Sequence, residues 1–313
     1  MKKILLTGAL GQIGSELTAA LQQKYGTDNV VATDIRYSEG AFGEGAVFET
    51  LDIMDGQKLL DIVKKHKIDT IIHLAAMLSA NAEKHPQRAW DINMNGLMNS
   101  LEVAREENCK FFTPSSIGAF GPSTIKNNTP QVTVQRPTSI YGVSKVASEL
   151  LCDYYFTKFG VDTRGLRFPG LISYLTPPGG GTTDYAVDIY YQAVKKKSYT
   201  SFLDRGTYLD MMYMPDAIGA TMRLLEAESG DLIHRNAYNV TAMSVDPESV
   251  ASSIRKHIPE FELSYDVDPI RQAIAESWPD HIDPTAAKEE FGFNPQYDLD
   301  RMTADMLKQV KPN

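Results

Sequence analysis

Gly8-Ala-Leu-Gly11-Gln-Ile-Gly14 comes directly after an apolar run at residues 3–7 and opens an amphipathic stretch at residues 12–24. A strand, a glycine-rich turn and a helix in this order bring backbone amides and a helix N-terminus to one place, where a dinucleotide pyrophosphate can bind. The spacing is Gly-x-x-Gly-x-x-Gly, whereas the commoner fingerprint is Gly-x-Gly-x-x-Gly. The segment predicts a dinucleotide site with contacts from Gly8, Gly11, Gln12, Ile13 and Gly14.

Strand-like and helix-like segments alternate through the first half of the chain. Short apolar runs lie at residues 3–7, 30–33, 47–51, 70–74, 111–113 and 164–168, and amphipathic stretches lie at residues 12–24, 56–66, 90–106 and 143–159. Alternation of this kind is typical of a doubly wound parallel sheet with helices on both faces. We therefore predict an α/β protein built on a Rossmann sheet.

The pattern changes after Pro169-Gly170. A loop rich in proline and glycine at residues 177–181 precedes a helical pattern at about residues 184–196, residues 236–240 could return to the sheet, and the chain is mainly helical from residue 246. We expect an NAD-binding core at residues 1–170, with a return around residues 212–245. We expect residues 171–313 to form a smaller, mostly helical substrate-binding part that is interleaved with the core.

Asp34 closes the second apolar run, about 20 residues after the last glycine of the turn, where an acid holds the adenosine ribose of NAD. A carboxylate at this place also disfavours the 2′-phosphate of NADP. Arg36 is the opposing signal, because an arginine nearby could serve NADP; we favour the alternative that it is a solvated loop charge. The sequence therefore predicts NAD as the cofactor.

The ends of the third and fourth apolar runs hold further candidates. Asp52 and Ile53 could contact the adenine, although a helix N-cap near Asp55 is an equal alternative for the aspartate. Small residues after His73 would let a ligand approach the backbone, whereas His73 itself is expected to be structural. A relay or packing role is open for Asn93, since asparagine is mildly unfavourable within a helix. The cofactor contacts expected here are Asp52, Ile53, Leu74, Ala75, Ala76 and Asn93.

Composition argues against several classes of function. The chain has 31 basic and 40 acidic side chains, a net charge of −9, and no basic run long enough to follow a nucleic-acid backbone. No apolar stretch approaches the ~18 residues of a membrane span, and the glycine turn interrupts the apolar start, so we expect neither a membrane anchor nor a signal peptide. Two cysteines favour a reduced, cytoplasmic location. Six scattered histidines lack metal-ligand spacing, so no metal site is predicted.

Tyr141-Gly-Val-Ser-Lys145 offers a base and a means to activate it. Residues four apart share one face of a helix, and a nearby ammonium favours the phenolate of a tyrosine, whose ordinary pKa is ~10. A solvated helix face is the alternative, because this spacing is common by chance. Ser116 follows the fifth apolar run, where ligands sit beyond the ends of parallel strands, so it could bond a substrate oxygen. Turn formation is the alternative for Ser115-Ser116.

Five motifs then occur in order: Thr7-Gly8-x-x-Gly11-x-x-Gly14, Asp34, Ser116-x-x-x-Phe120-Gly121, Tyr141-x-x-x-Lys145 and Leu166-Arg167-Phe168-Pro169-Gly170. Together they resemble the extended short-chain dehydrogenase/reductase family over essentially the whole chain. The resemblance implies a triad in which Tyr141 is the general base, Ser116 orients the reacting hydroxyl, and Lys145 lowers the pKa of Tyr141. It also implies cofactor contacts from Tyr141, Lys145 and Pro169.

A further segment resembles the signature of the L-threonine 3-dehydrogenases of this family: Gly179-Gly-Gly-Thr182-Thr183-Asp184-Tyr185-Ala186. A glycine loop that leads into a helix N-terminus, with two hydroxyls, suits a small carboxylate. Asp184 could face an ammonium or simply complement the helix dipole. Residues 273–279 also resemble this subfamily and are expected to shape the C-terminal part. The resemblance implies substrate contacts from Ser79, Ser116, Tyr141, Thr182, Thr183 and Asp184.

Two departures disfavour sugar nucleotides as substrates. Leu209 stands where related nucleotide-sugar epimerases carry a diphosphate-binding arginine, and Ile117-Gly118 stand where the dehydratases of the family carry an acidic pair. Arg271 could still reach an anion, so these readings stay open.

The leading expectation is an NAD-dependent, zinc-free oxidation of L-threonine at C3 to L-2-amino-3-oxobutanoate. The alternative enzyme is a nucleotide-sugar 4-epimerase of the UDP-glucose type. The non-enzyme alternative is an NAD-sensing binding protein, which the complete triad disfavours. The resemblance also implies a homodimer formed through helices at about residues 90–106 and 143–159.

Overall fold

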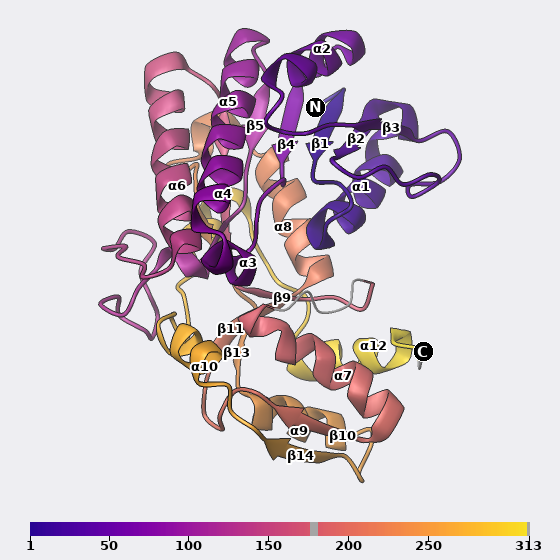
Figure 1. Ribbon diagram of the computed structural model, residues 1–313, viewed down its shortest axis with the longest axis vertical. Helices are drawn as coiled ribbons and strands as arrows, with labels where there is room; N and C mark the ends of the chain where they lie inside the picture. The colour runs from indigo at the N-terminus through magenta and orange to yellow at the C-terminus, as the bar shows by residue number, and fades with distance from the viewer. Residues whose placement is uncertain (176–180, 312–313) are drawn as a thin grey trace. The chain divides into compact units, whose positions relative to one another are not determined.

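The computed structural model describes residues 1–175 and 181–311, which fall into two compact units (Figure 1). The first unit consists of Met1–Ser116, Ser139–Arg167 and Thr221–Tyr238, and the second of Ile117–Thr138, Phe168–Ala220 and the residues from Asn239 onward. Residues 117–138 thus cluster with the second unit, whereas the sequence alone placed them within the core at residues 1–170. The glycines at positions 179 and 180 of the expected loop lie outside the described residues.

A six-stranded parallel sheet forms the centre of the first unit, in the order β3-β2-β1-β4-β5-β7. Its strands are β1 (Ile4–Thr7), β2 (Val30–Asp34), β3 (Val47–Thr50), β4 (Thr70–His73), β5 (Lys110–Phe112) and β7 (Thr163–Arg164). The strand order reverses at β1, which pairs with β2 on one side and β4 on the other. Ligands bind at such a switch point in doubly wound sheets, so the loops after β1 and β4 are in position to hold one. The predicted fold class is confirmed.

Helices cover the faces of this sheet. The first unit contains α1 (Gln12–Tyr25), α2 (Gly56–His66), α3 (Ser79–Lys84), α4 (Pro86–Trp90), α5 (Gly96–Glu106), α6 (Ile140–Phe159) and two 3₁₀ turns, η1 (Thr27–Asn29) and η5 (Ser229–Asp231). α2, α5 and α6 bury apolar side chains in one cluster with Leu5, Ile71 and Phe111 of the strands. α1 packs on β1 and β2. Full burial of each such side chain contributes about 1.5–3 kcal/mol.

The helix predicted at residues 90–106 is interrupted. A π-helical segment, η2 (Asp91–Asn95), lies between α4 and α5. Single π-helical turns within α-helices are frequent at functional sites, and this one contains Asn93. The short helix α3 was not predicted, because six residues give too little periodicity to distinguish a helix from a loop.

The strand predicted at residues 164–168 is also divided, into β7 and β8 (Leu166–Phe168). Gly165 separates them, and a Cβ at this position would lie only 2.8 Å from the carbonyl oxygen of Thr113 and 3.1 Å from the amide nitrogen of Ala237. The chain therefore needs a glycine for this close approach of backbones. β8 belongs to a three-stranded sheet with β6 (Ser115–Ser116) and β12 (Tyr238–Asn239).

The second unit has two smaller sheets and most of the C-terminal helices. β9 (Gly170–Ile172), β11 (Leu209–Tyr213) and β13 (Met243–Val245) form one sheet, and β10 (Ser198–Ser201) pairs with β14 (Glu262–Tyr265) in the other. The helical elements are η3 (Ile117–Ala119), η4 (Thr182–Asp184), α7 (Tyr185–Lys196), α9 (Pro247–Arg255), α10 (Pro269–Glu276), α11 (Thr285–Phe291) and α12 (Leu299–Gln309). α8 (Met214–Glu226) spans the boundary between the units in the sequence. β14 is the strand missed within the region expected to be mainly helical.

Among the described residues, none of the helices combines the length and the apolar character that a membrane span requires.

Candidate active site

The turn between β1 and α1 is built from backbone alone. Gly8 has φ +69°, in the left-handed region that favours glycine, and a Cβ there would lie 2.8 Å from the amide nitrogen of Ala75. A Cβ on Gly14 would lie 2.4 Å from the carbonyl oxygen of Gly8. Gly11 is the N-cap of α1 and brings no capping side chain to the helix N-terminus. This close-fitting backbone cradle lies where the sequence predicts the pyrophosphate of a dinucleotide, and the binding itself stays a prediction.

Asp34 lies beside this turn, at the end of β2. Its side chain is 7 % exposed; Oδ2 accepts a hydrogen bond from the amide of Leu10 at 3.1 Å. Oδ1 accepts from the amide of Arg36 at 3.1 Å and from Nε of Arg36 at 3.2 Å. Arg36 is therefore an exposed partner of Asp34 as well as a loop charge. The carboxylate is fixed at the place where the adenosine ribose is expected.

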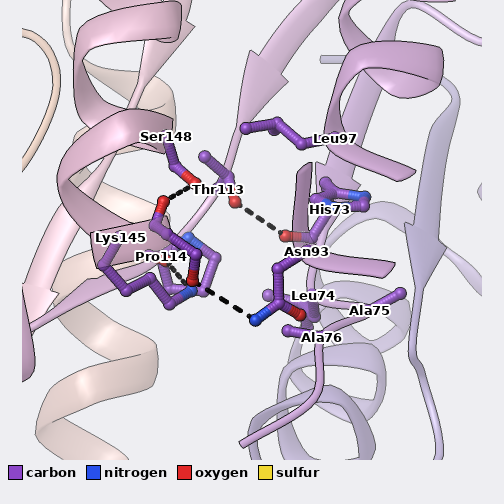
Figure 2. Close-up of a pocket in the computed structure, with 11 residues that line it drawn as sticks. His73, Leu74, Ala75, Ala76, Asn93, Leu97, Thr113, Pro114, Lys145 and Ser148 are labelled. Atoms are coloured by element: carbon purple, nitrogen blue, oxygen red, sulfur yellow. Dashed lines mark hydrogen bonds between the residues drawn. The ribbon is translucent and has the colours of Figure 1, made fainter. Parts of the chain in front are cut away.

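The residues after β4 line a pocket together with residues of α6 (Figure 2). The amides of Leu74 and Ala75 donate to the carbonyl and the hydroxyl of Thr7, at 3.1 and 3.3 Å, which joins the ends of β1 and β4. His73 is buried, and its Nδ1 lies 3.2 Å from the hydroxyl of Thr7 and 3.1 Å from that of Ser100. Burial, aided by the charge of Lys145, lowers the pKa of His73 to about 3, so this side chain is a neutral, hydrogen-bonded histidine.

Asn93 connects the loop after β4 to the helix α6. Its Oδ1 accepts from the amide of Met77 at 2.7 Å, and its Nδ2 donates to the carbonyl of Met77 at 3.1 Å and to the hydroxyl of Ser144 at 3.3 Å. The side chain thus bonds both backbone polar groups of Met77 and lines the pocket (Figure 2).

Asp52 and Ile53 lie just before α2, and their side chains have different surroundings. The carboxylate of Asp52 accepts from the amide of Met54 at 3.0 Å, whereas Asp55 caps α2 by accepting from the amide of Lys58 at 2.9 Å. The N-cap is therefore Asp55 itself, not Asp52. Ile53 is buried against Gly96 of α5.

Ser116, Tyr141 and Lys145 are brought together in the first unit. Ser139 caps α6 by accepting from the amide of Gly142 at 3.0 Å, which places Tyr141 in the first turn of the helix. The phenol hydrogen-bonds with Ser116. The Nζ of Lys145 lies 5.5 Å from the centre of the Tyr141 ring. It donates to the carbonyl of Pro114 at 2.7 Å (Figure 2).

The pKa values of this triad are set mainly by burial. Burial raises the pKa of Tyr141 to about 12, and the hydrogen bond with Ser116 opposes the rise. The direction is opposite to the one expected from Lys145. Burial also lowers the pKa of Lys145 to about 8, and the carboxylate of Glu149 opposes this change. Lys145 therefore remains mostly protonated at neutral pH, as its expected role requires.

The substrate contacts implied by resemblance are divided between the units. Ser79 begins α3 in the first unit, whereas Thr182, Thr183 and Asp184 form η4 in the second. Thr182 is buried, and Oδ2 of Asp184 accepts from the amide of Gly181 at 2.7 Å. That bond makes Asp184 a cap of its own helical turn. Pro169, expected at the cofactor, is a buried residue between β8 and β9.

Sequence reasoning missed a charged group next to this triad. Glu149 and Arg167 are each 7 % exposed and form a two-bond ion pair, and Ser115 donates to the same carboxylate. The available signal was the spacing of Glu149, four residues after Lys145 on the helix that carries the base. In the part of the chain that the structure describes, no cluster of three or more His, Cys, Asp or Glu residues is arranged to hold a metal ion.

Comparison with known proteins gives the family. Residues 4–241 match the model of the NAD dependent epimerase/dehydratase family. The chain belongs to this family. An uncharacterized epimerase/dehydratase of Staphylococcus saprophyticus is 60% identical over 99% of this chain and 98% of its own.

Solved structures of family members are also similar. The L-threonine dehydrogenase of Clostridium difficile is 60% identical, with a TM-score of 0.97 over 99% of this chain and 98% of that one. A monomeric L-threonine 3-dehydrogenase from a metagenome is 44% identical, with a TM-score of 0.93 over 98% of each chain. The protein is thus an enzyme of the NAD dependent epimerase/dehydratase family with a nicotinamide dinucleotide as cofactor and a small molecule as substrate.

Proposed function

We propose that the protein is an NAD-dependent L-threonine 3-dehydrogenase, which oxidises the C3 hydroxyl of L-threonine to give L-2-amino-3-oxobutanoate. The observation that carries the proposal is the joint presence of the Ser116, Tyr141 and Lys145 site and 60% identity to an L-threonine dehydrogenase over nearly the whole chain. NAD, when bound, supplies the acceptor for the hydride that leaves C3.

The chain's own residues handle the proton of the reacting hydroxyl. Tyr141 accepts this proton as general base, and Ser116, its hydrogen-bond partner, orients the substrate oxygen. Lys145 stands beside the ring as an ammonium and favours the phenolate, against the effect of burial. Because the base must lose its own proton first, turnover is expected to rise with pH until Lys145 begins to deprotonate.

Recognition of the amino acid is assigned to hydroxyl groups and a helix N-terminus. Ser79, Thr182 and Thr183 are proposed contacts of the substrate, the two threonines just before the helix α7, whose N-terminus favours a carboxylate. Asp184 already accepts a backbone hydrogen bond from Gly181. We therefore assign it a capping role, in preference to a contact with the ammonium of the substrate.

A nucleotide-sugar 4-epimerase is the competing function. Leu209 is fully buried in β11, so this position offers no cation for a diphosphate. The assay that separates the functions is purified protein with NAD and either L-threonine or UDP-glucose. We expect NADH to form with L-threonine only. Conversion of UDP-glucose to its 4-epimer without NADH formation would replace the proposal, and inactivity on both substrates would favour a binding protein.

Preference for NAD is expected to depend on Asp34. In Asp34→Asn the charge is lost but one oxygen remains for the amide of Leu10. Since a hydrogen bond to a charged group contributes about 1.5–3 kcal/mol, the ratio of kcat/KM for NAD over NADP should fall about 10- to 100-fold. Arg36→Ala is the matched control, and it should leave this preference intact or increase it. An unchanged ratio in Asp34→Asn would remove Asp34 from cofactor selection.

A homodimer is proposed through the helices expected at residues 90–106 and 143–159, which are η2 with α5, and α6, in the structure. α5 and α6 pack together. Large apolar side chains are exposed here: Leu150 and Tyr154, four residues apart on α6, are 63 % and 52 % exposed, and Trp90, where the first stretch begins, is 40 % exposed. Exposed apolar groups gathered on one face commonly mark an interface. Light scattering should give twice the chain mass for the wild type and a single chain mass for Leu150→Arg. A monomeric wild type, like the monomeric metagenomic relative, would refute the proposal.

A further inference from the structure

A buried ion pair lies one helical turn beyond Lys145. Nε of Arg167 donates to Oε1 of Glu149 at 3.0 Å, and its Nη2 donates to Oε2 at 2.8 Å. The hydroxyl of Ser115 donates to the same Oε1. Pairs of this kind are poor sources of stability, because removing two charges from water costs several kcal/mol and an apolar replacement is often equally stable. A stabilising role alone is therefore a weak explanation for burying them here.

The pair contacts the backbone that builds the site. Ser115 lies between Pro114, whose carbonyl accepts from Lys145, and Ser116, which bonds Tyr141. Glu149 is also four residues after Lys145 on α6, where regular helix geometry sets Cβ atoms about 5–6 Å apart. Glu149 thus stands one helical turn from Lys145, and its carboxylate is hydrogen-bonded to the short strand β6 that carries the serine.

We propose that Glu149 is a positioning residue of the active site: its carboxylate, held by Arg167 and Ser115, keeps Lys145 in its charged form and fixes the backbone of residues 114–116. The role of Lys145 in this proposal rests on the proposed function. Glu149 acts through these neighbours and not on the reacting hydroxyl itself.

The charges around this pair agree in sign with that role. Burial lowers the pKa of Lys145 to about 8, and Glu149 opposes this change. Cys152 lies nearby as a neutral thiol, because burial raises its pKa. His73 faces Lys145 from β4 and is neutral. Around Glu149, Asp153 of α6 has its pKa raised by burial and by the Glu149 carboxylate, and Arg167 acts in the opposite direction. Glu149 is the acid that most directly opposes deprotonation of Lys145.

The test is the pH dependence of Glu149→Gln. With isotope-labelled lysine, the Lys145 resonance is assigned by its loss in Lys145→Met and titrated by NMR without substrate. We expect the pKa of Lys145 to fall by about 1 unit, the low end for loss of a close opposite charge. The alkaline limb of kcat should move down by the same amount, so that kcat above the limb falls about tenfold.

Two further variants distinguish an effect of the lost Glu149 charge from an effect of impaired folding. The double variant Glu149→Gln with Arg167→Gln leaves neither charge unpaired, so it should fold even if the single variant does not, and its shift should be smaller but in the same direction. Asp162→Asn breaks a similar two-bond pair with the buried Arg164 at 2.9 Å, and it should lower thermal stability without moving the pKa of Lys145.

A folded double variant with an unchanged pKa of Lys145 would overturn the proposal. A wild type that does not oxidise L-threonine, but whose Lys145 titration still shifts on loss of Glu149, would instead reject the proposed function alone.

Discussion

Tyr141→Phe is expected to bind NAD as the wild type does and to lose turnover of L-threonine. Phenylalanine keeps the ring, so its packing in the first turn of α6 is preserved, while the group that accepts the substrate proton is removed. Positioned proton transfer contributes about 10²–10⁴-fold in rate, and kcat should fall by at least this factor. NAD affinity is measured by fluorescence titration and turnover by NADH formation.

Tyr154→Phe is the matched control for this variant. It is the same substitution on the same helix, at a side chain that is 52 % exposed. It keeps the ring that the proposed dimer interface uses, so wild-type turnover should be retained. Turnover of Tyr141→Phe within tenfold of the wild type would show that another group is the base.

Gly14→Ala is expected to have the second large effect, on cofactor binding and on stability together. Its new Cβ would lie 2.4 Å from the carbonyl oxygen of Gly8 and 2.8 Å from both Cα and the carbonyl oxygen of Ala9. All these atoms are backbone, so the turn itself must move. Overpacking of this kind costs about 1–3 kcal/mol, and we expect NAD affinity to fall at least tenfold.

Gly219→Ala provides the comparison for Gly14→Ala. Gly219 lies within α8, and a Cβ there meets no atom within 4 Å. Alanine should stabilise this helix by about 0.5–1 kcal/mol and leave NAD binding unchanged. Equal NAD affinities for Gly14→Ala and the wild type, from calorimetry, would mean that the glycine turn is not the cofactor cradle.

Local sequence patterns were enough to predict the core of the fold. The glycine turn at positions 8 to 14 and the alternation of apolar strands with amphipathic helices led to the doubly wound sheet that the structure shows. The relation of Tyr141 to Lys145 was also accessible, because it depends only on helical spacing. In each case neighbouring residues in the chain carry the information.

Features that depend on residues far apart in the chain could not be predicted from the sequence. The division of the strand at Gly165 depends on the backbones of Thr113 and Ala237, and the pairing of Glu149 depends on Arg167. The raised pKa of Tyr141 has the same origin. Spacing predicts the nearby cation, whereas burial, which has the larger effect, depends on the packing of the whole unit.

Oxidation of L-threonine at C3 is tested most directly by following the hydrogen at that carbon. The purified enzyme is incubated with NAD and L-threonine that carries deuterium at C3, and the NADH is analysed by mass spectrometry. We expect deuterium to be recovered in the NADH as L-2-amino-3-oxobutanoate forms. NADH without deuterium, or no NADH from L-threonine, would contradict the proposed reaction.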